Sequence, residues 1–122
     1  MRTTHINVNG KEYMLCISTR VLLHIEEKYG DSDGGLKQIM SNGKLSDVVW
    51  LLSEMIDAGD RYAKMESVEN PGAIPFDELL DRIGPDDYEL MFKSIAEATK
   101  AGTTPTVEIQ PQKNAKATQE GA

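Results

Sequence analysis

Leu45 to Ile56 read LSDVVWLLSEMI, the most continuously apolar run of the chain. Ser46 and Asp47 suit a helix start, because a serine can cap free backbone N–H groups and a carboxylate opposes the positive end of the helix dipole. From Val48 onward, apolar residues cover nearly the whole circumference of such a helix. A helix that is apolar all round is buried. This stretch therefore predicts a central helix around which the rest of the chain packs.

The composition indicates one small acidic domain. The 122 residues carry a net charge of -7, and an acidic body argues against nucleic acid, whose binding needs clustered Lys and Arg. No apolar run approaches the roughly 18 residues of a membrane span, and the first residues lack the order of a secretion signal. The single cysteine, Cys16, excludes an internal disulfide and fits a reducing compartment. We expect a soluble cytoplasmic protein.

Residues 3–17 predict a β-hairpin, because Asn9-Gly10 lies between two alternating segments. A two-residue turn pairs Val8 with Lys11 and sets the register of the remaining pairs. One face, expected in the core, carries Ile6, Val8, Tyr13, Leu15 and Ile17, and the other, expected mostly in solvent, carries His5, Asn7, Glu12, Met14 and Cys16. A lone hairpin is marginal in water, so it must pack on helices.

Helical patterns follow at residues 20–29, 36–42, 45–65, 75–83 and 85–101, with loops at 31–35 and 66–74. Thr19 and Ser46 are the expected caps of the first and third helices, and Gly59 predicts a bend or restart in the third. Leu80 is expected in the core. The fold class is α+β, mainly α, with the hairpin packed against four or five short helices in one domain at 1–102 (hairpin 3–17, helical body 19–101).

Residues 103–122 are polar, contain two prolines and have Val107 and Ile109 as their larger apolar residues. Such a segment buries too little surface to offset its ordering entropy. We expect a disordered tail, with residues 106–110 as a candidate strand for a sheet edge.

No residue pattern predicts catalysis or metal binding. Residues 31–33 resemble the start of a calcium loop, but Leu36 stands where the loop needs glycine and Asn42 where it needs glutamate. His5, Cys16 and His24 are too few for a zinc site, and the paired carboxylates fall where helix dipoles and solubility explain them. We expect no enzyme, no cofactor and no metal.

The order of features from Val8 to Gly43, and more weakly to residue 102, resembles the tail assembly chaperones of long-tailed (siphovirus-type) bacteriophages, prophages and gene transfer agents. The similarity comprises a hairpin with a GKEY-type second strand, a helix of the form TRxLxxIExxYG and a later LxDVxxLL segment. The matching residues are Gly10 to Tyr13, Thr19, Arg20, Leu22, Ile25, Glu26, Tyr29, Gly30, Leu45, Asp47, Val48, Leu51 and Leu52.

The resemblance implies a non-enzymatic protein of virion morphogenesis that binds the tape measure protein, with tail tube subunits as a further candidate partner. It also implies absence from the mature virion and, in many members, a longer frameshifted form, for which Thr103 onward is a suitable junction. Two alternatives stay open at this point: a structural tail or connector component of the particle, and a small prophage adaptor protein.

The candidate surface for a partner or for self-association into a homo-oligomer is the hairpin edge together with its Met14 and Cys16 side. Tyr13 and Met55 complete this set. Methionine side chains adapt to irregular partners, which is why they are included.

Overall fold

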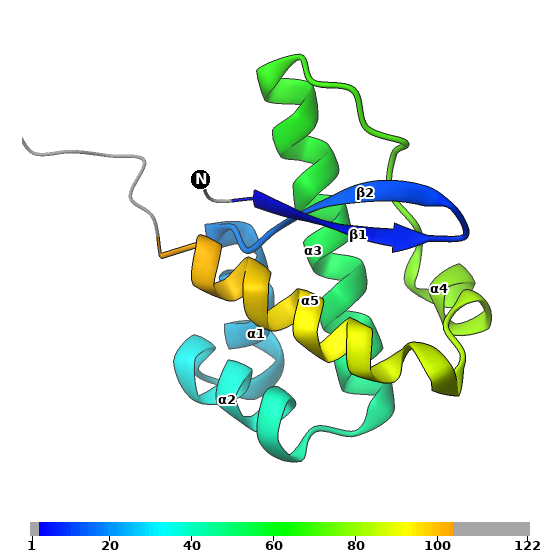
Figure 1. Cartoon of the computed structure of the whole chain (residues 1–122). Helices are drawn as coiled ribbons and strands as arrows, with labels where there is room; N and C mark the ends of the chain where they lie inside the picture. Colours follow the sequence, from blue (N-terminus) through cyan, green and yellow to red (C-terminus); the bar gives the residue numbers. More distant parts are fainter. Residues whose placement is uncertain (1–2, 104–122) are drawn as a thin grey trace, which may run out of the picture.

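The computed structural model describes residues 3–103, which form a two-stranded antiparallel hairpin and five α-helices (Figure 1). The predicted class, α+β and mainly α, is confirmed. Apart from Thr103, the predicted tail at 103–122 lies outside the described residues. The elements are β1 (Thr3–Val8), β2 (Lys11–Cys16), α1 (Thr19–Tyr29), α2 (Ser32–Asn42), α3 (Leu45–Glu66), α4 (Phe76–Arg82), the 3-10 turn η1 (Pro85–Asp87) and α5 (Tyr88–Ala101).

The hairpin has the predicted register. Val8 pairs with Lys11 and Ile6 with Tyr13, and the turn residues Asn9 and Gly10 have φ of 52° and 83°. Two positive φ values define the type I′ turn, whose twist matches that of the flanking strands. The Asn-Gly pair therefore fixes which residues of β1 and β2 share a face.

The predicted central helix is α3, a 22-residue helix that runs behind the hairpin and past α1, α4 and α5 (Figure 1). Leu51, Leu52, Met55 and Ile56 have no exposed surface. Two details of the prediction are wrong. The cap position is Lys44 rather than Ser46, which lies inside the first turn, and the helix continues without interruption through Gly59.

Gly59 allows β2 to lie directly on α3. A Cβ atom built on Gly59 would stand 1.8 Å from the Met14 carbonyl oxygen, so only a residue without a side chain permits this approach. Met14, Leu15 and Cys16 are consecutive and all buried. On the face expected mostly in solvent, His5, Asn7 and Glu12 are exposed. The expected exposure of Met14 and Cys16 on that face is wrong, because both faces of β2 are covered where it runs along α3.

The remaining helices correct the sequence boundaries. Helix α1 begins after Ser18, whose Oγ accepts the Val21 N–H, rather than after Thr19. Residues 31–35 are not a loop: Asp31 caps α2, and its Oδ2 accepts the Gly34 N–H at 2.6 Å. Position 35 of α2 needs glycine because α2 packs closely on α1 there: a Cβ atom at Gly35 would lie 2.7 Å from the Ile25 side chain.

Helices α4 and α5 close the core from the side of the hairpin turn and from below it (Figure 1). Leu79 of α4 and Met91 and Ile95 of α5 are buried, as their spacing predicts. Leu80, by contrast, is 42% exposed, and its expected burial is wrong. Since α4 has only seven residues, it presents a narrow face to the core.

Candidate functional site

The predicted surface residues are not brought together on a surface. Met14, Cys16 and Met55 belong to the buried core, and Tyr13 is half-buried against it. Met55 lies in the middle of α3, which the hairpin and the other helices enclose. In the described part of the chain these four side chains therefore stabilise the fold and do not form an exposed contact surface.

The exposed large apolar side chains are elsewhere, and the sequence pattern gave no signal for them. They are Leu23, Leu45, Met65, Val68, Leu80, Leu90 and Phe92. Met65, near the end of α3, is the most exposed of them at 74%. Among the hollows on the surface of residues 3–103, three differ in chemistry.

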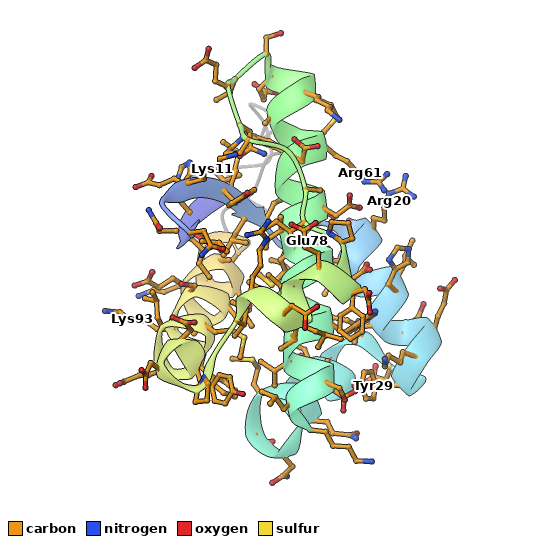
Figure 2. All side chains as sticks on the ribbon, turned by 90° about the vertical axis from the view of Figure 1, so that its right-hand side faces the viewer. Lys11, Arg20, Tyr29, Arg61, Glu78 and Lys93 are labelled. Atoms are coloured by element: carbon orange, nitrogen blue, oxygen red, sulfur yellow. The ribbon has the colours of Figure 1, made fainter. Side chains whose placement is uncertain are left out.

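The first is the Arg20–Met65 hollow, of about 320 Å³, between the start of α1 and the C-terminal half of α3. Its lining residues are Cys16, Ser18, Thr19, Arg20, Ala58, Arg61, Tyr62 and Met65. Figure 2 shows Arg20 and Arg61 reaching outward side by side from the two helices. Arg61 pairs with Asp57 through an Nη2–Oδ2 distance of 2.8 Å, whereas Arg20 makes no ion pair with any residue in 3–103. The hollow thus combines cationic and apolar groups.

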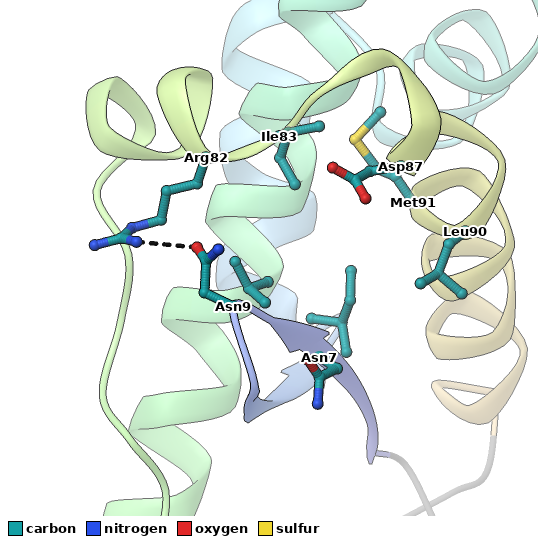
Figure 3. A pocket seen from close by; sticks show the side chains of 9 residues that line it. Asn7, Asn9, Arg82, Ile83, Asp87, Leu90 and Met91 are labelled. Atoms are coloured by element: carbon teal, nitrogen blue, oxygen red, sulfur yellow. Dashed lines mark hydrogen bonds between the residues drawn. The ribbon is translucent and has the colours of Figure 1, made fainter.

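The second is the β1 pocket, a cavity of about 90 Å³ beneath the hairpin turn (Figure 3). Its lining residues are Ile6, Asn7, Val8, Asn9, Arg82, Ile83, Asp87, Leu90 and Met91. Arg82 closes one side, because its Nη1 donates to the Asn9 Oδ1 at 2.9 Å. Metabolite sites usually occupy about 300 Å³ or more. This pocket fits one apolar side chain rather than a small-molecule substrate.

The third hollow, of about 330 Å³, lies between α3 and the segment leading into α4, with Trp50 and Phe76 in its lining. Glu54 in this lining is hydrogen-bonded through Oε1 to Nδ1 of His24. Lys28 Nζ stands 4.5 Å from the centroid of the Trp50 ring, within range of a cation–π interaction. A histidine–carboxylate pair still needs a nucleophile beside it for catalysis. Ser53 is the hydroxyl in this lining, and its Oγ donates to the Trp50 carbonyl at 2.7 Å rather than to His24.

Among the titratable groups of residues 3–103, Tyr29 has a strongly shifted pKa. Burial first, and then the neighbouring Asp47 carboxylate, raise the pKa of Tyr29 to about 12. A phenol with such a pKa is neutral at physiological pH and is a poor general base. Between residues 3 and 103 no group of three His, Cys, Asp or Glu side chains could hold a metal ion.

No protein-family model, curated protein or solved structure matches the chain. None of the helices within residues 3–103 has the length and apolar character needed to cross a membrane.

Proposed function

We propose that the protein is a phage or prophage tail assembly chaperone that binds the tape measure protein during tail morphogenesis, with tail tube subunits as a further candidate partner. Under this proposal it is not an enzyme, it works in the cytoplasm of the bacterial host, and it is absent from the mature virion. The resemblance of residues 8–43 to this family is the first support.

Several matching residues have roles that depend on their identity. Gly10 provides the second positive φ of the hairpin turn, and Gly30 ends α1 in the left-handed conformation with φ of 88°. Leu51 and Leu52 are fully buried in α3. The pattern therefore specifies a hairpin followed by helices, and it leaves Arg20 as a matching residue on the surface.

The observation that carries the proposal is the Arg20–Met65 hollow. A holding chaperone must cover apolar surface of its client while its own net charge keeps the complex soluble. Met65 provides an adaptable apolar contact, and Arg20 and Arg61 provide cationic contacts on a chain whose net charge is -7. Such a surface suits a helical client segment that has an apolar stripe flanked by carboxylates.

The test is co-expression of the full chain with the tape measure protein from its own genome, scoring the soluble fraction and copurification of the tape measure protein. We expect the wild type to keep the partner soluble and Arg20→Glu combined with Met65→Asp to lose at least 10-fold of the copurified partner. Lys93→Glu is the matched control, since Lys93 lies on α5 on the opposite side of the molecule (Figure 2).

A tape measure protein that stays insoluble with the wild-type chain contradicts the proposal. If the chain then forms regular assemblies by itself and copurifies with particles, the structural tail or connector function replaces the chaperone function. Equal loss in Lys93→Glu and in the double variant would leave the chaperone function standing but would assign the binding surface to another place.

A further inference from the structure

The β2 edge of the hairpin is covered. In an antiparallel pair the backbone groups of alternate residues point out of the ladder, and Met14 is such a residue in β2. The Met14 N–H donates to Asn70 Oδ1 at 2.9 Å, and the Met14 carbonyl faces Gly59 of α3. The loop after α3 and α3 itself therefore occupy this edge.

The β1 edge is open. His5 pairs with Met14, so the backbone N–H and carbonyl groups of His5, and those of Asn7 two residues later, also point outward. Both residues are exposed, and no hydrogen bond from residues 3–103 reaches these groups. Natural edge strands are usually protected by charges, prolines or bulges, and residues 3–8 contain no Pro, Lys, Arg, Asp or Glu. Such an edge can accept one more strand.

Helix α5 forms a floor beneath this edge (Figure 1). Its first turn lies at the end of β1, because Leu90 and Met91 line the β1 pocket together with Val8 (Figure 3). Its last turn lies near the start of β1, because a Cβ at Gly102 would stand 2.3 Å from Cγ2 of Ile17, the residue after β2. A strand added to β1 would therefore lie above α5 and would cover the half-exposed Leu90.

The same helix argues against a second copy of the chain as the added strand. Two hairpins joined symmetrically through β1 keep the same faces aligned, so both α5 helices would lie on one side of the joined sheet. The two β1 strands would be about 4.8 Å apart, whereas the axes of packed helices need about 8–10 Å. A single extended segment of a partner protein meets no such obstacle.

The surroundings of the edge define the chemistry of that segment. The β1 pocket, of about 90 Å³, admits one apolar side chain. Two acidic groups flank the edge: Glu12, exposed on the outer face where it pairs with Asn7, and Asp87 in the pocket lining. Neither forms an ion pair within residues 3–103, whereas the cationic Arg82 is held by Glu78 at 2.6 Å. The edge therefore favours apolar and basic side chains.

We propose that the β1 edge binds an extended segment of a partner protein in which apolar and basic residues alternate, as a third strand. Successive side chains of a strand point to opposite faces. The apolar side chains then face α5, and one of them enters the β1 pocket. The basic side chains lie on the outer face, where Asn7 is short enough to let them reach Glu12.

This site is separate from the Arg20–Met65 hollow. Figure 2 shows Lys11, at the hairpin turn, and Arg20 on opposite sides of α3. The site belongs to the isolated chain and does not depend on the chaperone function, so its test needs no tape measure protein. Its failure would leave the proposed function unchanged.

The first experiment measures amide hydrogen exchange of Asn7 in the full chain by NMR. Without a ligand we expect the rate of an unprotected amide. The probe is a seven-residue peptide of alternating lysine and valine, blocked at both ends. At about 1 mM it should slow this exchange at least 10-fold, which corresponds to a Kd of about 100 µM.

Unchanged exchange in the presence of the peptide overturns the proposal. Slow exchange without the peptide overturns it too, in favour of an occupant from the same chain or, if dilution removes the protection, of a second copy. The same peptide with glutamate in place of lysine should bind at least 5-fold more weakly, and equal binding overturns the assignment of a basic partner.

The second experiment compares variants of the chain by NMR titration with the lysine–valine peptide. His5→Pro removes an outward N–H, and edge strands tolerate proline at such positions, whereas His5→Ala keeps the N–H. We expect at least 10-fold weaker binding for His5→Pro and unchanged binding for His5→Ala. Slow exchange of the inward Ile6 amide verifies that the hairpin of each variant is intact.

Leu90→Gln tests the floor of the site without touching the hairpin. We expect it to weaken peptide binding at least 5-fold, because it removes the apolar contact beside the β1 pocket. Leu80→Gln is the matched control, since Leu80 is also exposed but does not line this pocket. Equal binding by Leu90→Gln, Leu80→Gln and the wild type overturns the proposed placement of the strand.

Discussion

The carbonyl oxygen of Met14 and the Cα of Gly59 are in direct contact, so that the edge of β2 lies on the backbone of α3. Elsewhere in a helix interior, replacing glycine by alanine stabilises by roughly 1 kcal/mol. Here the added methyl would stand 1.8 Å from that oxygen, and the obstacle is backbone rather than a flexible side chain.

We expect Gly59→Ala to destabilise the protein by about 3 kcal/mol or more, because overpacking that moves backbone exceeds the usual cost of 1–3 kcal/mol. Urea unfolding followed by circular dichroism measures it. Gly84→Ala is the control, since a Cβ at Gly84 meets only the Asp87 side chain, at 3.8 Å. A Gly59→Ala protein as stable as wild type would show that β2 does not approach α3 so closely.

Asn70 fastens the loop after α3 to the β2 edge. Its Oδ1 accepts the Met14 N–H at 2.9 Å, and its Nδ2 donates to Asp60 Oδ1 at 3.1 Å and to the Gly72 carbonyl at 3.2 Å. Removing this amide takes away the bond to the part-buried Met14 N–H and the bond to Oδ1 of the buried Asp60, whose Oδ2 keeps Lys64 Nζ at 3.1 Å. An unsatisfied buried group costs about 1–3 kcal/mol. We expect that loss for Asn70→Ala in urea unfolding.

Asn70→Asp distinguishes the hydrogen bond that Asn70 accepts from the two that it donates. It keeps an acceptor for Met14 but loses both donors and sets a carboxylate beside Asp60, so we expect at least the loss seen for Asn70→Ala. The neighbouring exposed Glu69→Ala should stay within about 0.5 kcal/mol of wild type. If Asn70→Ala were equally neutral, the amide would not hold the loop.

The sequence predicted the hairpin, its register and the central helix, because each depends on a short-range signal: Asn9-Gly10 for the turn and the apolar run after Val48 for burial. It did not predict what Gly59 does. A glycine inside a helical pattern looks like an interruption until the strand that crosses it is known. The same tertiary contact buries Met14 and Cys16, which periodicity alone assigns to solvent.

The surface was less predictable than the core for a related reason. Periodicity predicts which residues of a helix are buried. It does not predict that Met65 is exposed or that Arg20 and Arg61 line the same hollow, because both depend on how α1 crosses α3. Likewise, Gly34-Gly35 suggests a loop by composition, yet Gly35 is needed in α2 because Ile25 leaves no room for a side chain.

The hairpin turn gives a further prediction. Gly10 has φ of 83°, in the left-handed region that costs an L-residue roughly 1–2 kcal/mol. A Cβ there meets no atom within 4 Å, so the cost of Gly10→Ala comes from the backbone alone, and we expect about 1 kcal/mol in urea unfolding.

Asn9→Gly is the matched variant. It tolerates the positive φ of position 9 and removes only the exposed hydrogen bond to Arg82, so we expect a change within about 0.5 kcal/mol. Equal losses in the two variants would mean that the Arg82 contact, rather than the turn conformation, holds the hairpin end.

Tyr29 makes stability depend on alkaline pH. Its pKa is raised to about 12 by burial and by the Asp47 carboxylate, whereas the unfolded chain titrates near 10. Between these values the unfolded state loses its proton first, so the folded state binds more protons and its stability falls as the pH rises. The contribution is fully present below about pH 10 and amounts to about 2–3 kcal/mol when it is lost near pH 12.

Tyr29→Phe removes this titration, so its free energy of unfolding should fall less steeply than that of wild type across this pH range. The difference in tyrosinate absorbance between the two proteins isolates the Tyr29 curve and gives its midpoint directly. Asp47→Asn should move that midpoint only part of the way toward 10, because burial is the larger of the causes. A titration midpoint near pH 10 for Tyr29 in the wild type would mean that its hydroxyl is solvated and that Asp47 does not raise its pKa.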